Sequence, residues 1–129
     1  MATHAFASVQ YRDARAGLDF LQRAFGFELI AAHEGPDGSI QHAELRWGDS
    51  ILMAGEENED RVGKWGKHAG YGWTYLSVED ADAHHDRAKQ AGAEIIFPLT
   101  DTDYGSRDYT ARDPEGNVWS FGTYDPLNS

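Results

Sequence analysis

The sequence contains no cysteine, few basic residues and no apolar run long enough to cross a membrane. Without cysteine the chain forms no disulfide bond, offers no thiolate to a metal and has no cysteine nucleophile, which is compatible with a reducing compartment. The opening segment MATHAFASVQYRDAR lacks a basic region followed by an apolar stretch. We therefore expect no secretory signal and no membrane span, and we expect a cytoplasmic protein.

The scarcity of basic residues gives the chain a strong negative charge. It has 22 Asp and Glu against 11 Lys and Arg, a formal net charge of −11 at pH 7. Such a charge repels the phosphates of nucleic acids and the surface of anionic membranes, so neither is an expected partner. A cationic or neutral small molecule is a better match.

The length and the apolar content predict one folded domain over residues 1–129. A chain of 129 residues has the length of one compact domain, and such a domain buries roughly two thirds of its unfolded surface. Two independent domains are therefore not expected. Hydrophobic residues make up 40% of the chain and aromatic residues 12%, so a core can form. We therefore expect an ordered globular protein.

An internal repeat organises the chain. The segment GFELI at 26–30 is echoed by GAEII at 92–96, and each glycine follows a helix-like stretch, at 13–25 and at 80–91. Asp13 is a suitable N-cap for the first helix, whose apolar residues have helical spacing. The second helix has a thin apolar face, so its prediction depends mainly on the repeat. Its adjacent His84 and His85 are predicted to lie on a solvated face.

Each helix is flanked by strand-like segments in the same order. The predicted strands are 6–11, 27–33, 41–47 and 51–55 in the first half, and 73–78, 94–98, 107–112 and 118–124 in the second. Each half is thus β-α-β-β-β, with module one at about 3–55 and module two at about 72–125. The charged bridge at 56–71 is predicted to be a solvated linker, in which Trp65 either caps the site or covers surface. Trp47 is predicted to end its strand on the core side.

Four motifs connect this pattern with a known family. They are Tyr11-Arg12-Asp13-Ala14, Ala24-Phe25-Gly26-Phe27, the turn Asp113-Pro114-Glu115-Gly116-Asn117, and Trp119-Ser120-Phe121-Gly122-Thr123-Tyr124. Together with the duplicated module they resemble the vicinal oxygen chelate superfamily, and most closely its glyoxalase/bleomycin-resistance branch. The resemblance implies an α+β fold in which two βαβββ modules form a cup-shaped, eight-stranded mixed sheet with helices on its convex side. It also implies a homodimer and a ligand or metal in the cup.

The same resemblance allows a test for a metal site. In metal-using members, one ligand comes from the first strand of each module and one from the last. Those positions fall on Phe6, Met53, Trp73 and Ser120, and one offset of 67 residues relates both pairs. None of these side chains is a good ligand for a divalent cation, which favours carboxylate, imidazole or water oxygen. We therefore expect neither a metal nor another cofactor.

Strand alternation extends these positions into a predicted ligand-binding face. Residues such as Val9, Leu52 and Trp119 fall on the opposite, apolar face, which we assign to the core. For strand 107–112 the face stays open, and Tyr109 or Arg112 could each contribute. The predicted ligand-binding residues are Phe6, Ser8, Gln10, His42, Glu44, Met53, Trp73, Tyr75 and Ser120. The alternative is that Phe6, Met53 and Trp73 pack in the core or in a dimer interface.

This mixed aromatic and polar face favours a metal-free protein that binds a bulky aromatic, neutral or cationic antibiotic or metabolite, as a homodimer. One alternative is a lyase, isomerase or oxidoreductase of the glyoxalase/dioxygenase kind, with an absent or non-standard metal site. It would use His42 or Glu44 as acid or base, or the two as part of a shifted metal site. A third is an interaction module without a ligand. The chain lacks the glycine-rich loops of phosphate and dinucleotide sites and the turn that exposes a nucleophilic serine.

Overall fold

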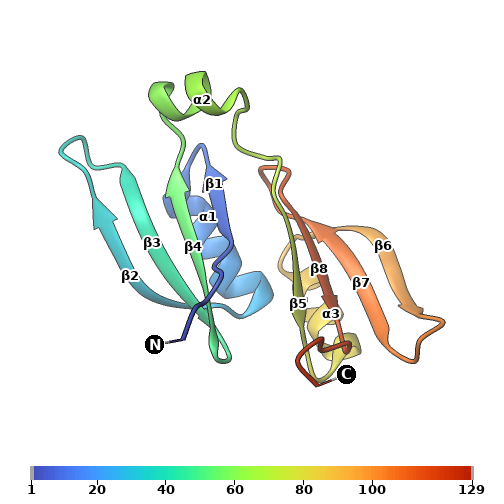
Figure 1. The fold of residues 1–129 in the computed structure, drawn as a ribbon. Coiled ribbons are helices and arrows are strands. Elements are labelled where there is room, and N and C mark those ends of the chain that lie inside the picture. Colours follow the sequence, from blue (N-terminus) through green and yellow to red (C-terminus); the bar gives the residue numbers. More distant parts are fainter. Residues whose placement is uncertain (1, 129) are drawn as a thin grey trace.

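The two repeated units are easily distinguished in a computed structural model, which describes residues 2–128 (Figure 1). Residues 1 and 129 of the predicted domain lie outside the described residues. The first unit contains β1 (Ser8–Tyr11), α1 (Ala14–Phe20), η1 (Leu21–Phe25), β2 (Glu28–Glu34), β3 (Ile40–Trp47) and β4 (Ser50–Glu56). After α2 (Glu59–Trp65), the second contains β5 (Trp73–Ser77), α3 (Ala81–Gln90), β6 (Glu94–Asp101), β7 (Arg107–Arg112) and β8 (Val118–Gly122).

The strands form two four-stranded mixed sheets with the same topology. Their orders are β1-β4-β3-β2 and β5-β8-β7-β6, and in each sheet the first pair is parallel while the other two are antiparallel. The α+β class and the two βαβββ modules are confirmed. Within residues 2–128, no backbone ladder joins the facing edges β1 and β5, so the eight strands are divided between two sheets.

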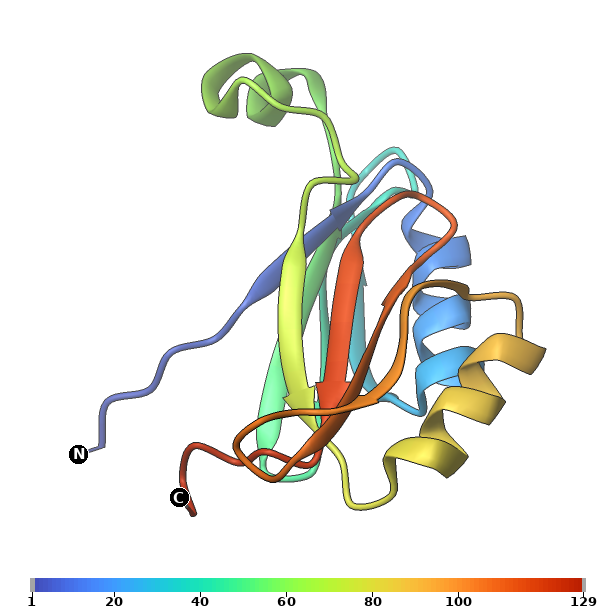
Figure 2. The ribbon, with the colours of Figure 1, turned by 90° about the vertical axis from the view of Figure 1, so that its right-hand side faces the viewer.

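The long helices lie on one side of both sheets. Figure 2 shows α1 and α3 on the right of the strands, with α2 and both chain ends projecting on the left. This arrangement leaves the other face of each sheet open. None of the helices in the described residues is long and apolar enough to cross a membrane.

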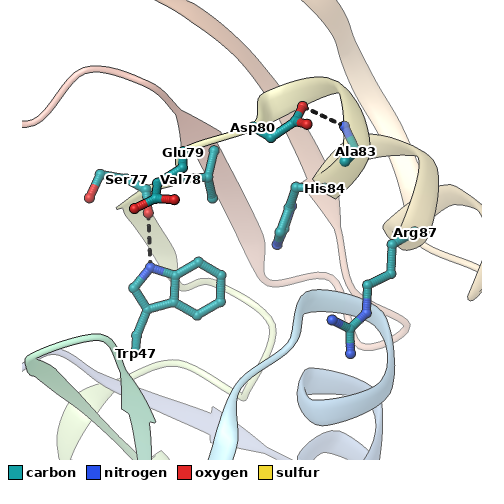
Figure 3. Close-up of a pocket in the computed structure, with 8 residues that line it drawn as sticks. All are labelled: Trp47, Ser77, Val78, Glu79, Asp80, Ala83, His84 and Arg87. Carbon is teal, nitrogen blue, oxygen red and sulfur yellow. Dashed lines mark hydrogen bonds between the residues drawn. The ribbon is translucent and has the colours of Figure 1, made fainter.

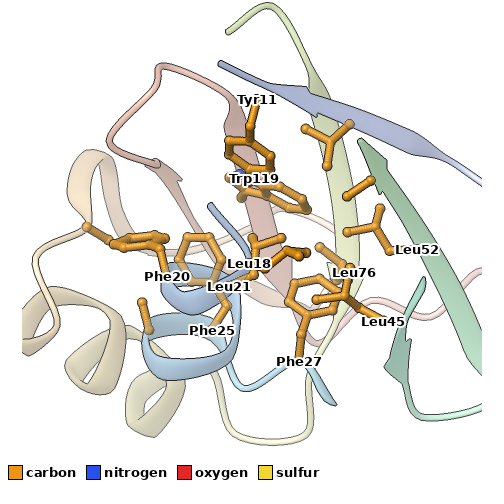
Figure 4. Close-up of a cluster of buried hydrophobic side chains, with 14 of the residues drawn as sticks. Tyr11, Leu18, Phe20, Leu21, Phe25, Phe27, Leu45, Leu52, Leu76 and Trp119 are labelled. Carbon is orange, nitrogen blue, oxygen red and sulfur yellow. The ribbon is translucent and has the colours of Figure 1, made fainter. Parts of the chain in front are cut away.

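The core lies between the helices and the covered sheet faces (Figure 4). Val9, Leu52 and Trp119 are at most 4% exposed, as alternation predicted. Tyr109 is also fully buried, which places it in the core and Arg112 on the open face of β7. Burial of each large apolar side chain contributes about 1.5 to 3 kcal/mol to folding. The alternation of the strands therefore fixes which residues face the core.

Asp residues begin both long helices, as capping chemistry predicts for the first. Asp13 accepts a hydrogen bond from the backbone N–H of Ala16, and Asp80 accepts one from Ala83. The predicted helix at 13–25 is continuous, but its last five residues form a π-helical turn that ends at Gly26, whose φ is 89°. Such a positive φ is one that glycine adopts without steric cost.

The bridge is only partly the linker that we predicted. Residues 59–65 form α2, which Asn58 caps at its start and Gly66 ends. None of the seven residues of α2 is buried. Its helical structure therefore depends on its caps and on Glu59 and Asp60 in its first turn, since acidic side chains stabilise the start of a helix.

The prediction of a solvated His84-His85 pair is wrong for His84. The His84 ring lies 4.2 Å from that of Phe121, its Nε2 donates to the carbonyl oxygen of Phe25 at 2.8 Å, and its Nδ1 lies 2.5 Å from the hydroxyl of Tyr109. Trp47 packs against the same ring, as its predicted core side requires. His84 therefore joins α3 to the first module. His85 is half-buried beside Asp86.

The turn between β7 and β8 also joins the two modules, through contacts with the start of module one. The Asp113 carboxylate, 3% exposed, accepts hydrogen bonds from the Tyr11 hydroxyl at 2.8 Å and the Trp119 indole at 3.1 Å. Burial and the neighbouring Asp113 raise the pKa of the Tyr11 hydroxyl far above its usual value. Glu115 accepts from the backbone N–H groups of Arg12 and Asp13. The Asp-Pro-Glu-Gly-Asn motif thus anchors module two on the β1–α1 corner of module one.

Single side chains connect the two sheets near both ends of the facing edges β1 and β5. Asn117 donates to the Gln10 carbonyl and accepts from the Gly72 N–H, at 3.2 and 2.8 Å. Towards the other end, the Trp47 indole N–H donates to the carbonyl oxygen of Ser77 at 3.0 Å. We call the boundary between these two strands the seam.

Candidate ligand-binding face

The open face of the first sheet carries polar and ionisable side chains. Strand register places Glu44 beside Met53 and Met53 beside Ser8, so these three residues cross the sheet in one row. His42 Nε2 lies 2.9 Å from a carboxylate oxygen of Glu44. The His33 ring stacks on that of His42 with centroids 6.0 Å apart. This sheet therefore offers a partly exposed imidazole–carboxylate pair.

The open face of the second sheet is aromatic and hydroxylic. The Trp73 indole N–H donates to Ser120 Oγ at 3.0 Å, and Ser120 Oγ lies 3.0 Å from Thr110 Oγ1. Trp73 remains 73% exposed and Phe97 65% exposed. The sheet therefore presents flat apolar surface held in place by short polar contacts.

Tyr75 lies in the same row as Ser120 and is more constrained than Trp73. Its hydroxyl donates to the carbonyl oxygen of Tyr124 at 2.7 Å. Burial raises the pKa of the Tyr75 hydroxyl, and Tyr104 and Asp108 nearby raise it further. The group is therefore a neutral hydrogen-bonding phenol at physiological pH.

Two cavities open at the ends of the seam. The cavity near α2 has a volume of about 240 Å³ and is lined by Ser8, Val9, Gln10, Trp65, Lys67, His68, Ala69, Gly70, Tyr71, Gly72 and Asn117. The other, of about 300 Å³, is lined by Ala5, Ala7, Trp47, Ser50, Ile51, Leu52, Thr74, Tyr75, Leu76, Ser77, Asp125, Pro126 and Leu127. Both are of a size that suits a ring system.

The structure brings some of the predicted ligand-binding residues together and leaves others apart. Ser8 and Gln10 line the α2 cavity and Tyr75 lines the other, whereas the His42–Glu44 and Trp73–Ser120 pairs lie on the open sheet faces. Met53 joins Ser8 and Glu44 in one row. Phe6 precedes β1 and its ring contacts that of His4.

The alternative that the aromatic residues belong to the core does not hold within the single chain. Phe6 is 49% exposed and Trp73 more so, while Met53 is half-buried on the open face. These apolar side chains could instead be covered by a second copy in a dimer or by a ligand, since exposed apolar patches mark such contacts.

Sequence reasoning missed Tyr71 at the site and left the role of Trp65 open. Trp65 ends α2 and Tyr71 precedes β5, and both line the cavity that contains Gln10 while remaining 63% and 72% exposed. The Lys67 ammonium lies 4.9 Å from the centre of the Tyr71 ring. The available signal was the presence of two aromatic side chains, Trp65 and Tyr71, in an otherwise polar bridge.

A third cavity, of about 430 Å³, lies between the modules on the helix side (Figure 3). Trp47, His84 and Arg87 point towards it in that view. Burial lowers the pKa of His84, and both of its ring nitrogens already have partners. Arg87 donates to the carbonyl oxygens of Gln22 and Arg23. These side chains are therefore occupied in joining the modules.

The residues at the four metal-ligand positions implied by the resemblance do not fit a divalent cation. They supply two aromatic rings, a thioether and a hydroxyl that is already shared between Trp73 and Thr110. In residues 2–128 no three His, Asp or Glu side chains are grouped so that they could hold a metal ion. The His42–Glu44 pair alone supplies fewer ligands than a typical catalytic metal has.

Comparisons with known proteins agree with this architecture. Residues 3–121 match the model of the Glyoxalase/Bleomycin resistance protein/Dioxygenase superfamily. The chain is 34% identical over 115 residues to the uncharacterized protein Mb0911c of Mycobacterium bovis, covering 85% of this chain and 76% of that protein. The crystal structure of TioX from Micromonospora sp. ML1 is 33% identical, with a TM-score of 0.79 over 94% of this chain and 98% of TioX. TnmS3, an antibiotic binding protein from Streptomyces sp. CB03234, shares the fold at 21% identity, with a TM-score of 0.72 over 94% of both chains.

Proposed function

Because this chain belongs to the Glyoxalase/Bleomycin resistance protein/Dioxygenase superfamily, we propose that it is a metal-free binding protein for a bulky, planar aromatic compound. The ligand is an antibiotic or metabolite, neutral or cationic, which the protein sequesters. The observation that carries the proposal is Trp73. It occupies a metal-ligand position implied by the resemblance, it is largely exposed, and its indole is oriented by Ser120.

The physical chemistry of the open faces supports this ligand class. Planar rings stack on exposed indole and phenyl faces, and each such pair contributes about 0.5 to 1.5 kcal/mol beyond simple burial. Glu44 and the net charge of −11 attract a cation and repel an anion. TnmS3 is by its name an antibiotic binding protein, which supports an antibiotic as the ligand class.

We propose that the functional unit is a homodimer. The exposed apolar residues Phe6, Trp73 and Phe97 lie on or beside the open sheet faces. A second copy over these faces would bury them together with the ligand, and exposed apolar patches mark such contacts. The proposal predicts a dimer in sedimentation experiments, and a monomer at all concentrations would refute it.

The His42–Glu44 contact favours one alternative, an enzyme. A carboxylate 2.9 Å from an imidazole orients the ring and supports proton transfer by its other nitrogen. In that case the double variant His42→Ala/Glu44→Ala would abolish turnover of a substrate that the native protein converts. Under the binding proposal, the same variant retains most of its affinity for a neutral ligand, because stacking on the second sheet is unchanged.

The test of the binding proposal is a titration of the native protein with planar aromatic antibiotics, followed by tryptophan fluorescence and thermal unfolding. A ligand that binds only the folded state raises the Tm. We expect Trp73→Ala to weaken binding about tenfold or more, which corresponds to about 1.4 kcal/mol. The control is Tyr104→Ala, which removes an equally exposed ring that packs on Tyr124. Failure of the whole panel to bind, or equal losses in both variants, would refute the proposal.

A further inference from the structure

Gln10 contains the one buried side-chain nitrogen or oxygen in residues 2–128 that has no hydrogen-bond partner, its Nε2. Buried amide groups nearly always have a partner, because an unpaired one loses its bonds to water without replacement. Gln10 was predicted from alternation to face the ligand. Its unpaired amide is therefore a feature of the single chain that needs an explanation.

The surroundings of Gln10 leave its side chain free for a ligand. The backbone carbonyl of Gln10 is already occupied by Asn117. Register places Gly55 beside Gln10 on β4, and Gly55 has no side chain that could cover or pair with the amide. The Arg61 guanidinium reaches this place, where a Cβ added at Gly55 would lie 3.0 Å from its Nη1, and a guanidinium has no acceptor for the amide Nε2.

On the other side, Gln10 lines the 240 Å³ cavity together with Trp65 and Tyr71. Both rings are largely exposed, and α2, which carries Trp65, buries none of its residues. Two exposed rings beside an unpaired amide provide stacking surface and one directional group. This combination is typical of a site that distinguishes planar compounds by one polar atom.

We propose that Gln10 selects planar aromatic ligands that carry a carbonyl-type oxygen. The inference rests on the proposed function, because it assigns ligand chemistry to one of the predicted ligand-binding residues. A rotation of the Gln10 side chain into the cavity takes the amide out of its buried position, so that Nε2 donates to the ligand oxygen. The bond is made only in the complex, and a ligand without the oxygen leaves the amide unpaired.

The experiment compares two probes that differ in a single group, 9-fluorenone and fluorene, by tryptophan fluorescence of the full chain. We expect the native protein to bind fluorenone about tenfold more tightly than fluorene. The variant Gln10→Met keeps the length and volume but has no donor, so it should bind both probes with similar affinity. The matched control Gln90→Met, on the exposed surface of α3, should keep the preference.

A second measurement does not depend on the variant's stability. The side-chain NH₂ resonances of Gln10 in the native protein should shift downfield with fluorenone and stay nearly unchanged with fluorene. Equal affinity for both probes, or a preference that persists in Gln10→Met, would overturn the inference and leave the proposed function intact. If the native protein binds neither probe and none of the aromatic antibiotics, the proposed function itself fails.

Discussion

The two modules have the same topology but differ on their open faces. Shifted by 67 residues, Val9 corresponds to Leu76 and Leu52 to Trp119, and all four are apolar and buried. On the open face, Ser8 corresponds to Tyr75 and Met53 to Ser120. The covered faces must fill one core, whereas the open faces are free to differ. The two modules therefore differ mainly in the side chains of their open faces, which are the ones available to a ligand.

The turns that join the last two strands of each module differ in the same way. In module one, only Gly48 and Asp49 separate β3 from β4, whereas five residues, from Asp113 to Asn117, separate β7 from β8. Only the longer turn reaches the other module, through the Asp113 and Glu115 carboxylates. The modules are thus joined asymmetrically, and substitutions at equivalent turns should reveal this.

The largest expected effect is that of Asp113→Ala. The substitution leaves the Tyr11 hydroxyl and the Trp119 indole buried without partners, and we expect a loss of roughly 3 kcal/mol or more in the free energy of unfolding. Urea denaturation measures it. Asp49→Ala in the exposed turn of module one is the matched control and should cost less than about 0.5 kcal/mol. Similar losses in both variants would show that the two turns are equivalent after all.

A smaller effect is expected from Gly122→Ala on the open face of module two. An added Cβ would lie 2.8 Å from both the Tyr75 hydroxyl and Asp108 Cβ, so the Tyr75 ring must move. We expect a cost of about 1 to 3 kcal/mol, measured by thermal unfolding, together with weaker ligand binding.

The control for that substitution is Gly63→Ala in α2, where an added Cβ meets nothing within 4 Å. It should stabilise the helix by about 0.5 to 1 kcal/mol, because alanine is the better helix former. A Gly122→Ala variant that is as stable as the native protein and binds ligand normally would show that the position of Tyr75 is unimportant.

The smallest effect is a pH dependence of stability that originates at His84, which joins α3 to the first module. Burial lowers the pKa of His84 in the folded state below its value of about 6.5 in the unfolded chain. The unfolded state therefore binds more protons as the pH falls through 6.5, so stability decreases towards acid pH. We expect the urea midpoint to fall between pH 7.5 and 5.5, a window above the titration of the carboxylates.

The variant His84→Gln should fall less over the same pH range. His68→Gln, which changes an exposed histidine outside the contact between the modules, is the matched control. If the urea midpoints of His84→Gln and of the native protein have the same pH dependence, the contact between α3 and the first module does not depend on a neutral imidazole.

Much of the fold could be predicted from the sequence because alternation and repetition are local signals. The faces of β1, β4, β5 and β8 follow from their apolar residues, and the Asp13 cap follows from its position. His84 could not be placed, because α3 has a thin apolar face and its inward histidine is identified only by Phe25 and Tyr109 from distant segments. Helix α2 was missed because it has no buried face to give it an apolar period.

The candidate site was less predictable than the fold for a similar reason. The His42–Glu44 and Trp73–Ser120 contacts lie within single sheets, where strand register brings their residues together. The Gln10 cavity depends on the path of the bridge, which carries Trp65 and Tyr71 back to β1. No local pattern in residues 56–71 predicts that the bridge returns to β1.

The seam has a mechanical consequence. Since no backbone ladder joins β1 to β5, the angle between the sheets is set by side chains such as Asn117 and Trp47. A change of that angle alters the width of the opening without breaking a single strand-to-strand hydrogen bond. The core is shared by both modules, with Phe25 of the first packed against Trp119 and Phe121 of the second, so such a change is resisted by side-chain packing and not by the backbone hydrogen bonds of the sheets.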